Sequence, residues 1–200
     1  MATFSDYAKN ILLVLLILQF APVILKTVKT QYSDLFEEKT RIGVITVKGF
    51  IGSAAQTVKD IKTVFEDTSL KAVVLKVDSH GGSSPAAQAI FQEILHYKKQ
   101  YPEKYVVTVI EQIAASGGYY IAVAGDHIIA TPSALIGSVG VFISHPSFKG
   151  LIERLHISYE ITKTGTFKGA GDPFLTISPE QKAQFQELTN DTYRQFVRDV

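Results

Sequence analysis

Three runs of aliphatic and β-branched residues in this chain are each followed directly by a turn of small residues. The turns are Asp78–Ser84, Ala114–Gly118 and Ser133–Gly140. Apolar residues with helical spacing follow the first turn, and a short apolar segment follows the second. Strands that alternate with helices require right-handed crossovers, which produce a mainly parallel sheet. The sequence therefore predicts an α/β fold.

The predicted elements extend over most of the chain. Strands are expected at 41–50, 72–77, 105–111, 126–131, 139–143 and 157–162, and helices from Ser53, from Pro85, after Ser116, over 146–155 and from Pro179 onward. The last helix begins with a capping box at Ser178–Gln181. Because ligands of open α/β sheets bind at the carboxyl ends of the strands, the three turns are expected to meet at one cleft.

The N-terminal segment differs in kind from the rest. Residues Ile11–Leu25 are apolar except for one glutamine, and a lysine flanks them on each side. As a helix they cover about 22 Å, and Tyr7–Ala8 with the lysine stems brings this closer to the ~30 Å of a hydrocarbon core. No small-residue cleavage site follows, which favours an uncleaved anchor over a signal peptide. We expect a membrane anchor over 1–29, a linker over 30–39 and a folded domain over 40–200, with orientation left open by the flanking charges.

Composition excludes several classes of function. The 20 Lys and Arg residues nearly balance the 19 Asp and Glu residues, so no nucleic-acid partner is expected. The chain has no cysteine, so it can form neither a disulfide nor a thiolate nucleophile. Its five histidines lack HxH or HExxH spacing, so no metal is expected, and no sequence feature indicates a cofactor.

Ser116 lies between a predicted strand and a predicted helix and is followed by two glycines. A hydroxyl at such a junction is exposed at the mouth of the fold, and the glycines let backbone and substrate approach closely. The free N–H groups at the start of the helix can stabilise a developing negative charge. The pattern suits a nucleophile, although a small-residue turn without chemistry has the same appearance.

A serine nucleophile needs a base, because its hydroxyl is weakly nucleophilic at neutral pH. Lys168, in the glycine-rich stretch Gly165–Gly171, is one candidate, provided that its amine loses its proton. His145 is the other, with Asp126 or Asp172 to orient it. Spacing alone does not decide between these bases and ordinary surface residues.

Taken together, the motifs resemble those of the S49 peptidases, the signal peptide peptidase A family, which have a ClpP/crotonase-like fold. The resemblance covers roughly residues 40–200. Ala114–Tyr120 matches the family's A-A-S-G-G-Y-Y motif, Gly165–Phe174 resembles its lysine loop, and Ile136–Val141 matches its I-G-S-x-G-V segment. In Asp78–Gly82 the family's N-S-P-G-G turn lacks its Asn and Pro but keeps both glycines.

The resemblance implies a membrane-anchored serine endopeptidase. It assigns Ser116 as nucleophile, Lys168 as general base and Ser138 as the residue that orients the lysine. The N–H groups of Gly82 and Gly117 would hold the oxyanion. The resemblance further implies a homo-oligomer with active sites near subunit interfaces on the extracytoplasmic side. Its substrates would be signal-peptide remnants or other short or unfolded membrane-associated polypeptides, and no cofactor or metal is implied.

Three other functions stay open at this stage. The first is a ClpP-type hydrolase that uses Ser116 and His145. The second is a catalytically inactive, membrane-tethered scaffold that binds peptides. The third is a crotonase-type acyl-CoA enzyme, for which no residue gives specific support. The family's usual C-terminal G-R-x-x-x-G segment does not occur before Val200, so we expect the domain over 40–200 to lack its usual C-terminal end.

Overall fold

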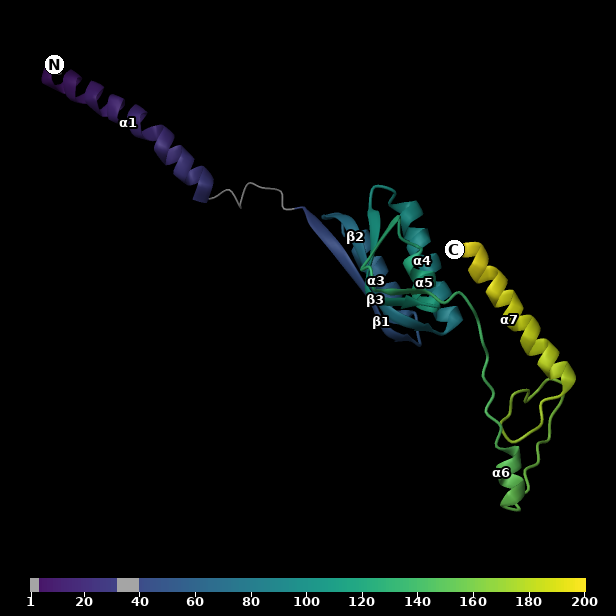
Figure 1. The fold of residues 1–200 in the computed structure, drawn as a ribbon. Helices are drawn as coiled ribbons and strands as arrows, with labels where there is room; N and C mark the ends of the chain where they lie inside the picture. The colour runs from purple at the N-terminus through teal and green to yellow at the C-terminus, as the bar shows by residue number, and fades with distance from the viewer. Residues whose placement is uncertain (1–3, 32–39) are drawn as a thin grey trace. The chain divides into compact units, whose positions relative to one another are not determined.

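The computed structural model describes residues 4–31 and 40–200, which fall into two compact units (Figure 1). The first unit extends to Thr40 and contains helix α1 (Phe4–Gln31). The second unit is Arg41–Val200 and contains the sheet and the remaining described helices.

Helix α1 is apolar over most of its length. Residues Ile11–Lys29 have a mean hydropathy of 2.4, and none of this stretch is buried. By length and composition it can cross a membrane, and Pro22 inside it is compatible with a membrane helix. The helix continues to Gln31, past the expected boundary at residue 29. The rest of the expected linker, 32–39, lies outside the described residues.

The second unit is built on a parallel sheet with strand order β1-β2-β3-β4, in which β5 pairs with the carboxyl end of β3. This confirms the predicted mainly parallel α/β fold. The strands are β1 (Arg41–Ile51), β2 (Leu70–Gly82), β3 (Tyr105–Ala115), β4 (His127–Ala130) and β5 (Leu135–Gly137). The helices are α3 (Ala55–Glu66), α4 (Ser84–Gln100), α5 (Gly117–Ala122), α6 (Lys149–Arg154) and α7 (Pro179–Asp199).

The hydrophobic core lies on one face of this sheet, between the strands and helices α3, α4 and α5. Alternate strand residues such as Leu75 and Ile110 are buried there with Phe65 of α3 and Ile90 of α4. This follows from the period of two in strands, which sends every second side chain to the same face. The burial of these apolar side chains is the main driving force for folding of the unit.

Within residues 41–200, no helix covers the opposite face of the sheet, and this face is apolar near the amino ends of the strands. Ile42 and Val44 of β1 are 57% and 58% exposed, and Tyr105 and Ile129 are exposed to a similar extent. Parallel sheets are normally covered on both faces, because their strands are apolar on both sides. This face is therefore a surface suited to packing against another protein segment.

Residues 139–178, called the arm below, leave the core and carry α6 (Figure 1). None of the residues from 125 to 180 is buried. The strands predicted at 139–143 and 157–162 are wrong, since both segments lack regular structure. Their alternating apolar pattern fits a strand, but a strand also needs a neighbour for its backbone hydrogen bonds, and the unit provides none. Helix α6 is also shorter than the helix predicted over 146–155.

The turn predicted at Asp78–Ser84 is largely part of a strand instead. Strand β2 continues to Gly82 and stays paired with β1, with Gly82 opposite Ile51. A Cβ on Gly82 would lie 2.4 Å from the Ile51 carbonyl oxygen, so the strands approach too closely for any side chain. Strand β5 likewise forms inside the turn predicted at Ser133–Gly140. Strand β2 is also paired with β3 as far as Ser79, which lies opposite Ala114.

Candidate active site

Ser116 joins β3 to α5 in a strained backbone conformation. Its φ and ψ are 51° and −122°, a region normally occupied by glycine. Its N–H donates to the Gly137 carbonyl at 2.8 Å, and its carbonyl accepts the Tyr120 N–H at 2.9 Å. Strand β5 and helix α5 therefore both hold this residue. Such strain is typical of functional sites and resembles the strand-to-helix turn that exposes a nucleophilic serine.

The glycines around Ser116 are required by close backbone packing. Gly81 has a φ of +96°, and a Cβ on it would lie 2.8 Å from the Gly117 nitrogen and 3.0 Å from the Ser116 Cβ. A Cβ on Gly117 would lie 3.5 Å from the Gly82 nitrogen. The predicted oxyanion donors, Gly82 and Gly117, are thus brought together beside Ser116. Gly117 is also the first residue of α5, where backbone N–H groups lack a partner within the helix.

Ser79 supports this arrangement through its side-chain hydrogen bonds. It was not singled out from the sequence. It is fully buried, its hydroxyl donates to the Gly49 carbonyl at 2.6 Å, and it accepts the Gly81 N–H at 3.0 Å. These bonds hold Gly81 against the Ser116 turn. The available signal was the alternation of β2, because Ser79 lies two residues after the core residue Val77.

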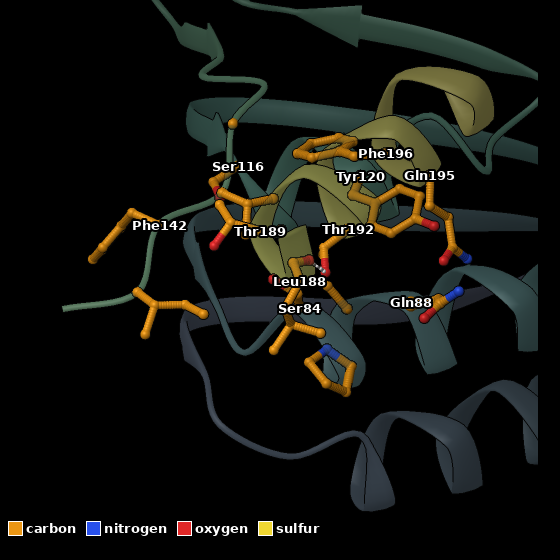
Figure 2. A pocket seen from close by; sticks show the side chains of 16 residues that line it. Ser84, Gln88, Ser116, Tyr120, Phe142, Leu188, Thr189, Thr192, Gln195 and Phe196 are labelled. Atoms are coloured by element: carbon orange, nitrogen blue, oxygen red, sulfur yellow. Dashed lines mark hydrogen bonds between the residues drawn. The ribbon is translucent and has the colours of Figure 1, made fainter. Parts of the chain in front are cut away.

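A cavity of about 290 Å³ opens beside Ser116 (Figure 2). The amino end of α4, the Ser116 turn with α5, arm residues 140–143 and helix α7 line it. None of the side chains that line it is charged. Ser116 lies on one side of the view in Figure 2, and Gln88 and Gln195 lie on the other. Such a cavity suits an uncharged, mainly apolar group held close to the serine hydroxyl.

An aromatic stack centred on Tyr120 packs helix α7 against the core beside the cavity. The Tyr120 ring packs between Phe91 and Phe196, with both centroid distances 4.8 Å. Its hydroxyl donates a short hydrogen bond to the Asp199 carboxylate. Burial, together with this carboxylate, raises the pKa of Tyr120 well above its ordinary value. The predicted capping box of α7 is confirmed, but the sequence did not predict that α7 lines the site.

Lys168 does not line this cavity. It is exposed in a turn of the arm, and no hydrogen bond or ion pair joins it to another residue of the described ranges. Ser138 follows Gly137, whose carbonyl accepts the Ser116 N–H, but Ser138 is exposed and makes no hydrogen bond to Lys168. One copy of the chain therefore brings Ser116, Gly82 and Gly117 together and leaves the predicted base on the arm.

His145, the alternative base, is also absent from the lining of the Ser116 cavity and contributes to two neighbouring cavities. Asp126 forms an ion pair with Lys98 at 2.8 Å. Asp172 accepts the Tyr159 hydroxyl at 2.8 Å, and this bond raises the pKa of Tyr159. Both carboxylates therefore have other partners. Within residues 4–31 and 40–200, no group of three His, Cys, Asp or Glu side chains is arranged to hold a metal.

Comparison with known proteins gives a consistent result. The sequence pattern of peptidase family S49 matches residues 98–200. A Synechocystis protein provisionally named a protease is 34% identical over 170 residues, which cover 82% of this chain and 60% of that protein. A protein of Enterococcus faecium provisionally named signal peptide peptidase SppA is 36% identical over 141 residues, 70% of this chain and 40% of its own.

Two more distant matches were also found. Protease 4 of Haemophilus influenzae is 32% identical over 162 residues, 72% of this chain and 26% of its own length. A solved structure of a ClpP1 mutant from Listeria monocytogenes shares 18% identity, covers 48% of this chain and 51% of its own, and has a TM-score of 0.36. The chain thus spans 60% or less of the Synechocystis, E. faecium and H. influenzae proteins.

The packing of Gly81 against Ser116 generates a first prediction. Gly81→Ala should lower the free energy of unfolding by about 2–4 kcal/mol, because its Cβ meets backbone and its φ is positive. Chemical denaturation of the full chain measures this change. Gly150→Ala is the control, since no atom lies within 4 Å of its added Cβ. Equal midpoints for the two variants would contradict the inferred close packing.

Proposed function

The chain belongs to peptidase family S49, and on this premise we propose that it is a serine endopeptidase with Ser116 as nucleophile and Lys168 as general base. The observation that carries the proposal is the strained Ser116 turn, with Gly82 and Gly117 beside it and an uncharged cavity next to it. Acyl transfer from a peptide requires a hydroxyl, oxyanion donors and a binding cavity, together with the base that Lys168 is proposed to supply.

The proposed reaction proceeds through an acyl-enzyme. Neutral Lys168 accepts the Ser116 proton as the serine oxygen bonds to the peptide carbonyl carbon, and the N–H groups of Gly82 and Gly117 stabilise the oxyanion. One such donor is worth about 3 kcal/mol of transition-state stabilisation. Lys168 then protonates the leaving amine, and water hydrolyses the ester. Ser138, next to the residue that binds the Ser116 N–H, is proposed to orient the lysine amine.

We infer that Lys168 reaches Ser116 from a neighbouring copy of the chain. Three observations support this inference: the Ser116 cavity has no charged lining, the arm has no buried residue, and one face of the sheet is uncovered. Surfaces that a single chain leaves unpartnered can be covered in a symmetric oligomer, where each copy gives and receives the same contact.

The proposed substrates are short or unfolded membrane-associated polypeptides, including signal-peptide remnants. The uncharged cavity supports apolar substrate segments, because a charged side chain would lose its hydration there without a partner. The E. faecium relative that carries a signal peptide peptidase name supports the same class. We also propose that α1 anchors the chain in a membrane, with Arg41–Val200 on the extracytoplasmic side.

Substitution of the two proposed catalytic residues tests the mechanism. Ser116→Ala and Lys168→Ala should each lower kcat on unfolded casein by about 10³- to 10⁴-fold. Lys163→Ala, which changes another exposed lysine of the arm, should retain wild-type turnover. Full activity of Lys168→Ala, with loss in His145→Ala, would favour the Ser–His hydrolase. Failure of the assembled wild type to react with a fluorophosphonate at Ser116 would favour the inactive scaffold.

Mixing of the two inactive variants tests the origin of the lysine. When Ser116→Ala and Lys168→Ala chains are unfolded, mixed in equal amounts and refolded together, random assembly should restore about a quarter of the wild-type sites if serine and lysine come from different copies. Active-site titration counts these sites. The control is Ser116→Ala mixed with the double variant Ser116→Ala, Lys168→Ala. An inactive mixture, in oligomers shown to contain both chains, would mean that each copy uses its own lysine.

Extraction of membranes tests the anchor. The wild-type chain should remain in the pellet at alkaline pH, whereas the double variant Leu15→Arg, Ile17→Arg should be released, since each arginine costs about 2.5–3.5 kcal/mol at the centre of a membrane helix. Release of the wild type by alkali would contradict the anchor. Digestion of residues 41–200 by a protease added to intact spheroplasts would support the extracytoplasmic side, and complete protection would contradict it.

A further inference from the structure

Helix α7 lines the Ser116 cavity, and the proposed function assigns it no role. We propose that α7 forms the wall of this cavity that selects the substrate side chain, and that Phe196 and Asp199 are positioning residues that hold this wall through Tyr120. The proposal rests on the proposed peptidase function and deepens it, because it identifies what determines the side chain accepted next to the scissile bond.

One face of α7 makes this wall. Leu188, Thr192, Gln195 and Phe196 line the cavity, and their spacing of four, seven and eight residues places them on the same side of a helix. Figure 2 shows these four side chains around the cavity, together with Ser84 and Gln88 of α4. All of these side chains are uncharged. The wall therefore suits a medium or large apolar side chain and disfavours a charged one.

The wall is held to the core by a small contact. Within α7 only Gln181 and Phe196 are buried. Gln181 belongs to the capping box at the amino end of the helix and donates a long hydrogen bond to the Thr166 carbonyl in the arm. The attachment of the carboxyl end to the core thus depends on Phe196, which is 5% exposed, and on Asp199.

Tyr120 links this contact to the nucleophile. Its side chain stacks on Phe196 and donates its hydroxyl proton to Asp199, while its backbone N–H donates to the Ser116 carbonyl at 2.9 Å. Tyr120 therefore closes the first turn of α5 after Ser116 and also attaches α7 to the core. The Tyr120 ring thus sets the distance between the α7 wall and Ser116. Loss of the contacts of Tyr120 with Phe196 and Asp199 should therefore change side-chain selection more than the chemistry at Ser116.

The experiment compares two peptides that differ only in the residue on the acyl side of the scissile bond, leucine in one and alanine in the other. Tyr120→Phe keeps the ring stack and removes the hydroxyl, and Asp199→Ala removes the acceptor. Each should lower kcat/KM for the leucine peptide about ten-fold, mainly through KM, because a hydrogen bond to a charged group is lost. The leucine-to-alanine ratio should fall as well, which a general loss of stability would not produce.

Matched variants separate the anchor from other effects. The double variant Tyr120→Phe, Asp199→Ala should be no worse than either single variant, because all three remove the same hydrogen bond. Asp191→Ala, which breaks an exposed ion pair with Arg194 on the same helix, should leave both peptides unaffected. Thr192→Phe fills the cavity without touching the anchor, so it should reverse the preference toward the alanine peptide even if an anchor variant fails to fold.

The outcomes distinguish this inference from the function beneath it. A wild type that cleaves both peptides, with an unchanged ratio in Tyr120→Phe, Asp199→Ala and Thr192→Phe, would overturn the role of α7 and leave the peptidase intact. A wild-type oligomer that neither cleaves peptides nor reacts with a fluorophosphonate at Ser116 would overturn both. A reversed ratio in Thr192→Phe with unchanged ratios in the anchor variants would keep the wall and overturn the positioning role of Asp199.

Discussion

The close approach of two backbones, the end of β2 and the Ser116 turn, is the constraint on which the site depends. Gly81 has no side chain, so it can lie against the Gly117 nitrogen. The buried Ser79 hydroxyl accepts the Gly81 N–H and donates to the Gly49 carbonyl, which links Gly81 to β1. This close approach brings the backbone of Gly82 and Gly117, the proposed oxyanion donors, beside Ser116. It also supports the strained φ of Ser116, since a strained conformation persists only where its surroundings over-determine it.

The second constraint is what a single chain leaves unfinished. One face of the parallel sheet is exposed and apolar, and the arm has no buried residue. Both need a packing partner to remove apolar surface from water. The proposed origin of Lys168 in a neighbouring copy would join this requirement for packing to the requirement of the serine for a base. Assembly and activity would then depend on the same contacts.

Much of the fold could be predicted because its signals are local. Strands β1 to β4, helices α3, α4, α5 and α7, and the capping box of α7 each depend on residues within a few positions of one another, and the predictions of these elements are confirmed. The strands predicted at 139–143 and 157–162 are wrong because a local signal is not sufficient for a strand. Their pattern is local, but a strand exists only if a second strand lies beside it. The turn predicted over 78–84 became paired strand because β1 lies alongside.

The sequence alone determined the alternation of strands and helices, the apolar N-terminal segment and the serine turn with its glycines, because these follow from side-chain chemistry and short-range spacing. Only the tertiary structure decided that Ser79 supports the turn, that Tyr120 joins Ser116 to α7, and that Lys168 lies outside the Ser116 cavity. These facts concern residues that are 30 or 79 positions apart from their partners, or, for Lys168, have no hydrogen-bond or ion-pair partner among residues 4–31 and 40–200. Such contacts arise from the packing of whole elements, which local patterns do not encode.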